Sequence, residues 1–131
     1  MLRATDEREI EASFESFSQS KASVLTIGTD AFFNGQTERL ARLATRYAVP
    51  TIYQYREFTL AGGLMSYGAS VNDSYRLGGI YVGRILKGER LADLPVQQST
   101  KLELIINLKA AGALNLQVPS QLVARADEII E

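Results

Sequence analysis

The sequence contains neither cysteine nor histidine among its 131 residues. Without cysteine the chain can form no disulfide, offer no thiol nucleophile and supply no thiolate ligand to a metal. Without histidine it has no Ser-His-Asp triad, no imidazole general base and no His-bound zinc. These two absences exclude most hydrolytic and zinc-dependent mechanisms, so any catalysis by the chain would depend on carboxylates.

Long apolar runs and an excess of one charge are also lacking. No apolar run approaches the roughly 20 residues that span a bilayer, and the opening MLRATDEREIE does not read as a signal peptide. The formal net charge is −1 and the basic residues are scattered, so no nucleic-acid partner or anionic membrane is indicated. An apolar content of 46% and a charged content of 22% are typical of a soluble globular protein, here of one-domain length.

Helical patterns alternate with short apolar runs along the chain, which predicts an α/β fold around a parallel sheet. The first helix is expected to begin at Thr5 or Asp6, where Asp6 and Glu9 resemble a capping box. The further helices are expected at residues 36–47, 70–88, 108–114 and 121–130, and the strands at residues 23–28, 51–54, 64–66 and 101–107. The helix at 70–88 carries an apolar stripe with Gly78 and Gly79 in it, which predicts close packing on the sheet.

Aromatic and polar residues gather at one edge of this predicted sheet. Ligands of open parallel sheets bind outside the carboxyl ends of the strands, which here are followed by the loops 29–35, 54–58 and 67–70. Aromatic walls with a few polar groups indicate a small-molecule pocket, or half of one. The candidate ligand-binding residues are Asp30, Phe33, Asn34, Tyr53, Gln54, Glu57, Ser66 and Tyr67.

Several of these residues also have a purely structural interpretation. Asp30 could cap the turn after the first strand, and Asn34 could be the N-cap of the helix at 36–47. Phe33 could fill the top of the core. Glu57 could pair with Arg56 or Lys21 at the surface.

The same edge gives little support to catalysis. Asp30 and Glu57 could act as an acid/base pair only at a fixed separation and with divergent pKa values, and no further catalytic group is evident. GTDAFFNG and GGLMSYG lack the glycine spacing of a phosphate-binding loop or a dinucleotide-binding fingerprint. We therefore expect a protein that is not an enzyme and binds no cofactor or metal.

Five stretches, in their order and spacing, carry a resemblance to a known family: VPTIYQYREF, GGLMSYG, VGRILKG, ADLPVQQSTKLELIINLK and VPSQLVARADEIIE. They resemble the C-terminal part of ABC transporter substrate-binding proteins of the tryptophan/tyrosine transport type. The resemblance implies one partial lobe, with a three-layer Rossmann or flavodoxin-like sheet, of a type I periplasmic-binding-protein fold. It implies a lobe core at about residues 1–98 and a return strand and helices at 99–131, directed toward a missing N-terminal lobe.

The resemblance also implies a function, namely delivery of a small solute, such as an aromatic or other amino acid, to an ABC permease outside the cytoplasm. Asp30 or Glu57 would then hold the ammonium group of the solute. Its apolar side chain would contact Phe33, Tyr53 and Tyr67. The solute carboxylate would meet the absent lobe.

Two alternatives remain open from the sequence. The chain could be the effector-binding domain of a transcriptional regulator with the same fold, or a stand-alone flavodoxin-like interaction domain. If it is an isolated lobe, the apolar strip that faces its partner lobe would be exposed, and a homodimer would be unsurprising.

Overall fold

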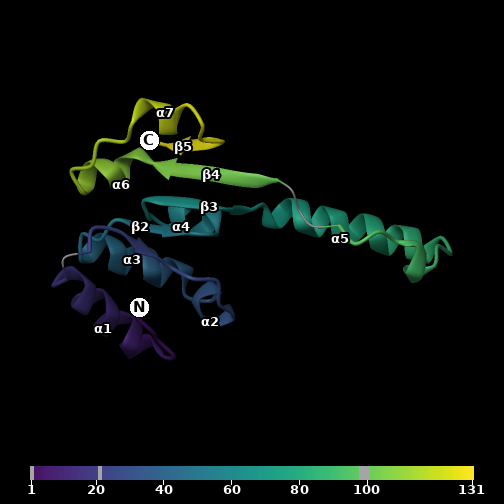
Figure 1. The fold of residues 1–131 in the computed structure, drawn as a ribbon, viewed down its shortest axis with the longest axis horizontal. Helices are drawn as coiled ribbons and strands as arrows, with labels where there is room; N and C mark the ends of the chain where they lie inside the picture. The colour runs from purple at the N-terminus through teal and green to yellow at the C-terminus, as the bar shows by residue number, and fades with distance from the viewer. Residues whose placement is uncertain (1, 21, 98–100) are drawn as a thin grey trace. The chain divides into compact units, whose positions relative to one another are not determined.

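The computed structural model describes residues 2–20, 22–97 and 101–131 (Figure 1). The chain divides into two compact units. The sheet unit comprises Met1–Gly68 and Glu103–Glu131, and the helical unit comprises Ala69–Leu102. No helix among the described residues is long and apolar enough to cross a membrane.

A five-stranded sheet in the order β1-β2-β3-β4-β5 organises the fold. The strands are β1 (Leu25–Thr26), β2 (Thr51–Tyr53), β3 (Met65–Ala69), β4 (Leu102–Asn107) and β5 (Glu128–Ile130). The pairs β1–β2, β2–β3 and β4–β5 are parallel. β4 runs opposite to β3, because Asn107 N donates to Leu64 O while Ser70 N donates to Lys101 O. The predicted α/β class with a mostly parallel sheet is confirmed.

The described part of the sheet unit contains six helices: α1 (Glu7–Ser18), α2 (Ala31–Asn34), α3 (Thr37–Arg46), α4 (Arg56–Leu60), α6 (Leu108–Ala113) and α7 (Ser120–Val123). α1 begins where the sequence predicted, because the Asp6 carboxylate accepts from the backbone N–H groups of Arg8 and Glu9. Glu9 accepts from Thr5 N, one residue before the capping-box position.

The hydrophobic core lies where α1 and α3 pack together and meet β2 and α4. Ile10, Phe14, Leu40, Tyr53 and Phe58 are each at most 3% exposed within it. The buried residues of α1 are Ile10 and Phe14, and Leu40 of α3 is followed by the buried Leu43 and Ala44, so each helix buries one face at helical spacing. At the surface Arg46 pairs with Glu11 at 2.8 Å, and Arg39 pairs with Glu7.

The end of the chain differs from the prediction of a helix at 121–130. The helix there is only α7, and residues 128–130 form β5. Asp127 explains the change, because its backbone N–H donates to Leu104 O while its carboxylate accepts from Leu104 N at 2.8 Å. These bonds attach the segment to β4, where Ile129 lies opposite Ile106.

The expected division between residues 98 and 99 falls within the undescribed residues 98–100 and stays a prediction. Residues 103–131 join the sheet of residues 1–68, and residues 69–102 form the separate unit. The physical reason is the pairing of β4 beside β3, in which Ile105 and Ile106 are both almost fully buried.

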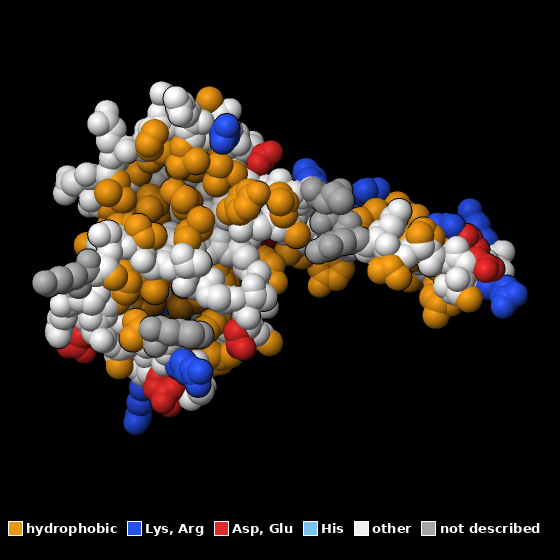
Figure 2. Space-filling model, in the orientation of Figure 1, with side chains coloured by type: hydrophobic (Ala, Val, Ile, Leu, Met, Phe, Trp, Pro, Cys, Tyr) orange, Lys and Arg blue, Asp and Glu red, His pale blue; other side chains and the backbone are white. Residues whose placement is uncertain are grey.

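The helical unit consists of α5 (Val71–Leu86) and the short helix η1 (Leu91–Asp93). Ser70 caps α5, and Gly88 follows its end at φ 93°, so the helix agrees with the predicted range 70–88. The predicted packing of its apolar stripe on the sheet would join two units that are described separately, so it stays a prediction. α5 has no buried residue, Tyr75 is 78% and Leu86 82% exposed, and nothing lies within 4 Å of a Cβ built on Gly78 or Gly79. Figure 2 shows apolar side chains exposed along this unit.

Candidate functional site

A chain of hydrogen bonds joins the loops that follow β1 and β2. Thr29 Oγ1 donates to Gln54 Oε1 at 2.6 Å, and Gln54 Nε2 reaches Asn34 Oδ1 at 3.5 Å. Tyr53 Oη donates to the same Asn34 oxygen at 2.7 Å. The structure therefore brings Asn34, Tyr53 and Gln54 together at the carboxyl end of the sheet, where the sequence predicted them.

Tyr53 anchors this network from inside the core. Its side chain is 2% exposed, and its ring makes edge contacts with Tyr55 and Phe58. The pKa of Tyr53 is raised to about 12, mainly by burial. A hydrogen bond with the Gln54 side chain lowers the pKa, and the charges of Tyr55 and Asp30 raise it. The phenol is therefore neutral and remains a hydrogen-bond donor at physiological pH.

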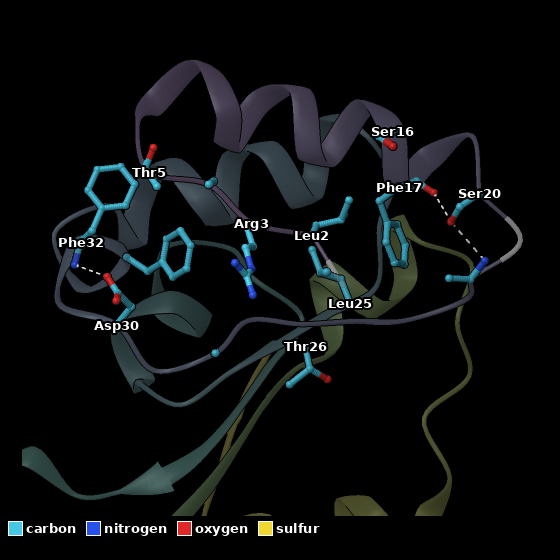
Figure 3. A pocket seen from close by; sticks show the side chains of 14 residues that line it. Leu2, Arg3, Thr5, Ser16, Phe17, Ser20, Leu25, Thr26, Asp30 and Phe32 are labelled. Atoms are coloured by element: carbon cyan, nitrogen blue, oxygen red, sulfur yellow. Dashed lines mark hydrogen bonds between the residues drawn. The ribbon is translucent and has the colours of Figure 1, made fainter.

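Asp30 lies at the start of the short helix α2, and Phe33 lies within it. The Asp30 carboxylate accepts from Phe32 N at 2.8 Å as the N-cap of α2, so its capping role is confirmed. Phe33 is half-buried against the core, with its ring 5.6 Å from that of Phe32. Both residues line a hollow of about 960 Å³ that runs along β1 beneath α1, past Leu25 (Figure 3).

Asn34 does not have the structural role that the sequence allowed for it. The N-cap of α3 is Gln36, which makes no side-chain capping bond, and Asn34 is the last residue of α2. Its backbone oxygen accepts from Thr37 Oγ1 at 2.9 Å. The Asn34 side chain is thus free of a capping function and is held by Tyr53 and Gln54 instead.

Glu57 and Asp30 line different hollows. Glu57 lines a second hollow of about 610 Å³ together with Asn34 and residues of α3 such as Arg42, whereas Asp30 lines the first. Arg56 pairs with Glu128 at 2.9 Å rather than with Glu57, and Lys21 lies outside the described residues. Among the described residues, no hydrogen bond or shared hollow joins Asp30 to Glu57.

Ser66 and Tyr67 follow one another on β3 but differ in exposure. Ser66 lies opposite Tyr53 in the register, is 1% exposed, and its hydroxyl has no hydrogen-bond partner among the described residues. Tyr67 is 53% exposed. At the next position a Cβ on Gly68 would lie 2.3 Å from Gln54 O, so only glycine allows β3 to approach the end of β2 this closely.

Two contributors to this edge were missed by sequence reasoning. Thr29 holds the Gln54 amide, and its signal was its position directly after the first strand. Glu128 pairs with Arg56, and it was missed because residues 121–130 were assigned to a helix. Together the edge offers amides, hydroxyls, aromatic rings and a carboxylate, which are groups suited to holding a small polar molecule.

Comparison with solved structures shows the same fold in larger proteins. The chain superposes on a conserved domain protein from Vibrio cholerae O1 biovar eltor with a TM-score of 0.83 at 22% identity, covering 96% of this chain and 42% of that one. An ABC domain from Streptococcus pneumonia in complex with L-Trp gives a TM-score of 0.82 at 22% identity, covering 94% and 41%. The ligand-free, open structure of CD0873 from Clostridium difficile, a substrate-binding protein with adhesive properties, gives 0.65 at 25% identity, covering 98% and 42%.

The chain thus spans about two fifths of the length of these proteins. A comparison with curated proteins finds no match. The family model for ABC transporter substrate binding proteins matches residues 2–130, which is nearly the whole chain. The chain belongs to the ABC transporter substrate-binding protein family.

Proposed function

We propose that this chain forms one wall of the cleft in which a solute-binding protein holds a small solute for an ABC importer. The observation that carries the proposal is the hydrogen-bonded network of Thr29, Gln54, Asn34 and Tyr53 at the carboxyl end of the sheet. Open α/β sheets bind ligands at this edge. The family match and the L-Trp held by the pneumococcal neighbour support an amino acid as the solute class.

The roles of the individual residues follow from their exposure and charge. Asp30 is exposed and forms no ion pair with a described residue, so it is available to a ligand ammonium. Phe33 and Tyr67 offer partly exposed rings to an apolar side chain. Tyr53 and Ser66 are buried and support the wall from behind, while Glu57 extends it toward α3.

A second lobe completes the cleft in this proposal. Solute-binding proteins close two lobes around their ligand, and burial between two walls excludes water. The exposed apolar face of α5 fits the docking of further polypeptide, since monomeric proteins rarely leave such a face uncovered. The complete protein would act outside the cytoplasm and present its solute to a membrane permease.

An amide NMR titration of the labelled chain with a panel of L-amino acids at millimolar concentration tests the proposal. We expect shifts confined to residues 29–35, 53–58 and 66–68. Shifts distributed elsewhere, or no shift with any member of the panel, would contradict it.

Asp30→Asn provides a charge-specific variant for the same titration. Asparagine caps helices as well as aspartate does, so α2 is retained while the carboxylate is lost. We expect binding to weaken roughly tenfold, as for the loss of a hydrogen bond to a charged group. Asp93→Asn, at an exposed position in η1, is the matched control and should leave affinity unchanged.

A further inference from the structure

We infer that Asn34 presents the N–H groups of its side chain, and not its oxygen, to the solute, and so selects a hydrogen-bond acceptor such as a carboxylate or carbonyl oxygen. The inference rests on the proposed function and specifies the ligand chemistry of the same wall. It also places an acceptor-binding group on this chain, where the sequence alone assigned the solute carboxylate to the other lobe.

The orientation of the Asn34 amide is set by Tyr53. A phenol carries one hydrogen, and the Tyr53 hydroxyl donates it to Asn34 Oδ1 at 2.7 Å. If the amide were reversed, two N–H groups would face this hydroxyl and the buried phenol hydrogen would need another acceptor. The Gln54 side chain also lies beside this hydroxyl, but it lowers the pKa of the phenol and so acts as a donor, while its Oε1 accepts from Thr29. The phenol hydrogen would then be left unpaired in a buried position, which is costly.

Gln54 reinforces the same orientation through Thr29. The Thr29 hydroxyl donates to Gln54 Oε1 at 2.6 Å, which turns Gln54 Nε2 toward Asn34 Oδ1 at 3.5 Å. Asn34 Oδ1 therefore receives two donors, which matches its two lone pairs. The Asn34 Nδ2 hydrogens find no acceptor among the described residues, and the residue is exposed.

This arrangement leaves the two N–H groups of Asn34 Nδ2 available at the carboxyl end of the sheet. Asn34 sits one turn after Asp30 on α2, with Asn34 N bonded to Asp30 O at 3.1 Å. The Asp30 carboxylate, which accepts hydrogen bonds, and the Asn34 amide, which donates them, are thus both held by one short helix. Asp30 lines the first hollow and Asn34 the second, so a solute that carries both a cationic group and an acceptor group, such as a zwitterionic amino acid, would reach from one hollow to the other.

The orientation is tested without ligand by Asn34→Asp and Asn34→Leu. Aspartate keeps the oxygen that Tyr53 and Gln54 donate to, so the urea midpoint of Asn34→Asp should equal that of the wild type, while Asn34→Leu should lower it. The measurement is made with added salt, which screens the new negative charge. Asn72→Asp in α5 adds the same charge at another position and is the control. An Asn34→Asp midpoint as low as that of Asn34→Leu would overturn the inference.

The selectivity is tested by NMR titration of the same variants with L-amino acids and with the corresponding amines that lack the carboxylate, for example L-tryptophan and tryptamine. We expect Asn34→Asp to weaken amino-acid binding by roughly tenfold or more, because the donors are replaced by an acceptor, and to leave amine binding equal or tighter. If the wild type binds but Asn34→Asp leaves the affinity unchanged, or weakens the binding of amino acids and amines equally, the inference is overturned while the proposed function stands. Absence of wild-type binding to every probe overturns the proposed function, and the inference with it.

Discussion

The phenol of Tyr53 couples the candidate site to the stability of the core. It is 2% exposed and donates to Asn34 at 2.7 Å, so ionising it removes a donor from a buried position. The pKa of Tyr53 is raised from 10.0 to about 12 in the folded chain. The folded state therefore resists ionisation more strongly than the unfolded state does.

Stability should consequently fall with alkaline pH. The contribution of the neutral phenol is fully present below pH 10.0, the unfolded value, and is lost as pH rises through about 12. The loss should reach about 2–3 kcal/mol of unfolding free energy, since one pKa unit corresponds to about 1.4 kcal/mol. Urea unfolding from pH 8 to 12 measures it, and Tyr53→Phe should flatten this part of the profile. A profile unchanged in Tyr53→Phe would show that another group is responsible.

Gly68 is a second single residue with a measurable role. A Cβ at this position would lie 2.3 Å from Gln54 O, which is backbone and cannot swing aside. We expect Gly68→Ala to lower the unfolding free energy by about 1–3 kcal/mol, as overpacking does. Gly112→Ala in α6, where nothing lies within 4 Å of the added Cβ, should instead be neutral or stabilising by up to about 1 kcal/mol. Equal effects of the two substitutions in urea unfolding would contradict the close approach.

Among the elements, α3 shows where sequence patterns suffice. Leu40, Leu43 and Ala44 recur at helical spacing and are all buried, so a local pattern accounts for the helix that was predicted at residues 36–47. The last strand shows the opposite. Residues 128–130 become β5 through pairing with β4, a contact distant in sequence that no local pattern reports.

α5 combines both cases. The helix was predicted at residues 70–88 from local signals, whereas the partner of its apolar stripe depends on tertiary contacts that no local pattern reports. The same limit applies to the site. Its position at the carboxyl edge follows from topology, whereas the pairing of Asn34 with Tyr53 required the geometry of the folded loops.

The exposed face of α5 should make the isolated chain associate with itself. Tyr75 and Val82 are 78% and 56% exposed on this helix, and apolar burial contributes about 25 cal/mol per Å². We expect sedimentation at increasing concentration to show a growing apparent mass, and Tyr75→Lys combined with Val82→Lys to abolish this growth. Arg42→Lys on the exposed side of α3 is the control and should leave association intact. A chain that stays monomeric at millimolar concentration would refute this expectation.

At the scale of the whole molecule, the two units should differ in local stability. α3 buries four side chains, Leu40, Ala41, Leu43 and Ala44, whereas α5 buries none. Segments with few buried contacts open at low free-energy cost, irrespective of their length. Amide hydrogen exchange should therefore be faster in residues 71–86 than in residues 37–46, although α5 is the longer helix. Equal protection of the two helices would indicate that α5 is covered in solution.

The order of strands has one more consequence for the chain as a whole. β3 and β4 are antiparallel neighbours, and such strands can be joined by a two-residue turn. In topological terms they are the two legs of a β-hairpin whose tip has been expanded into the helical unit, residues 69–102. The helical unit is thus an insertion that the sheet does not need for its connectivity. Replacing it with an Asn-Gly tip would give a minimal scaffold that carries the candidate wall alone.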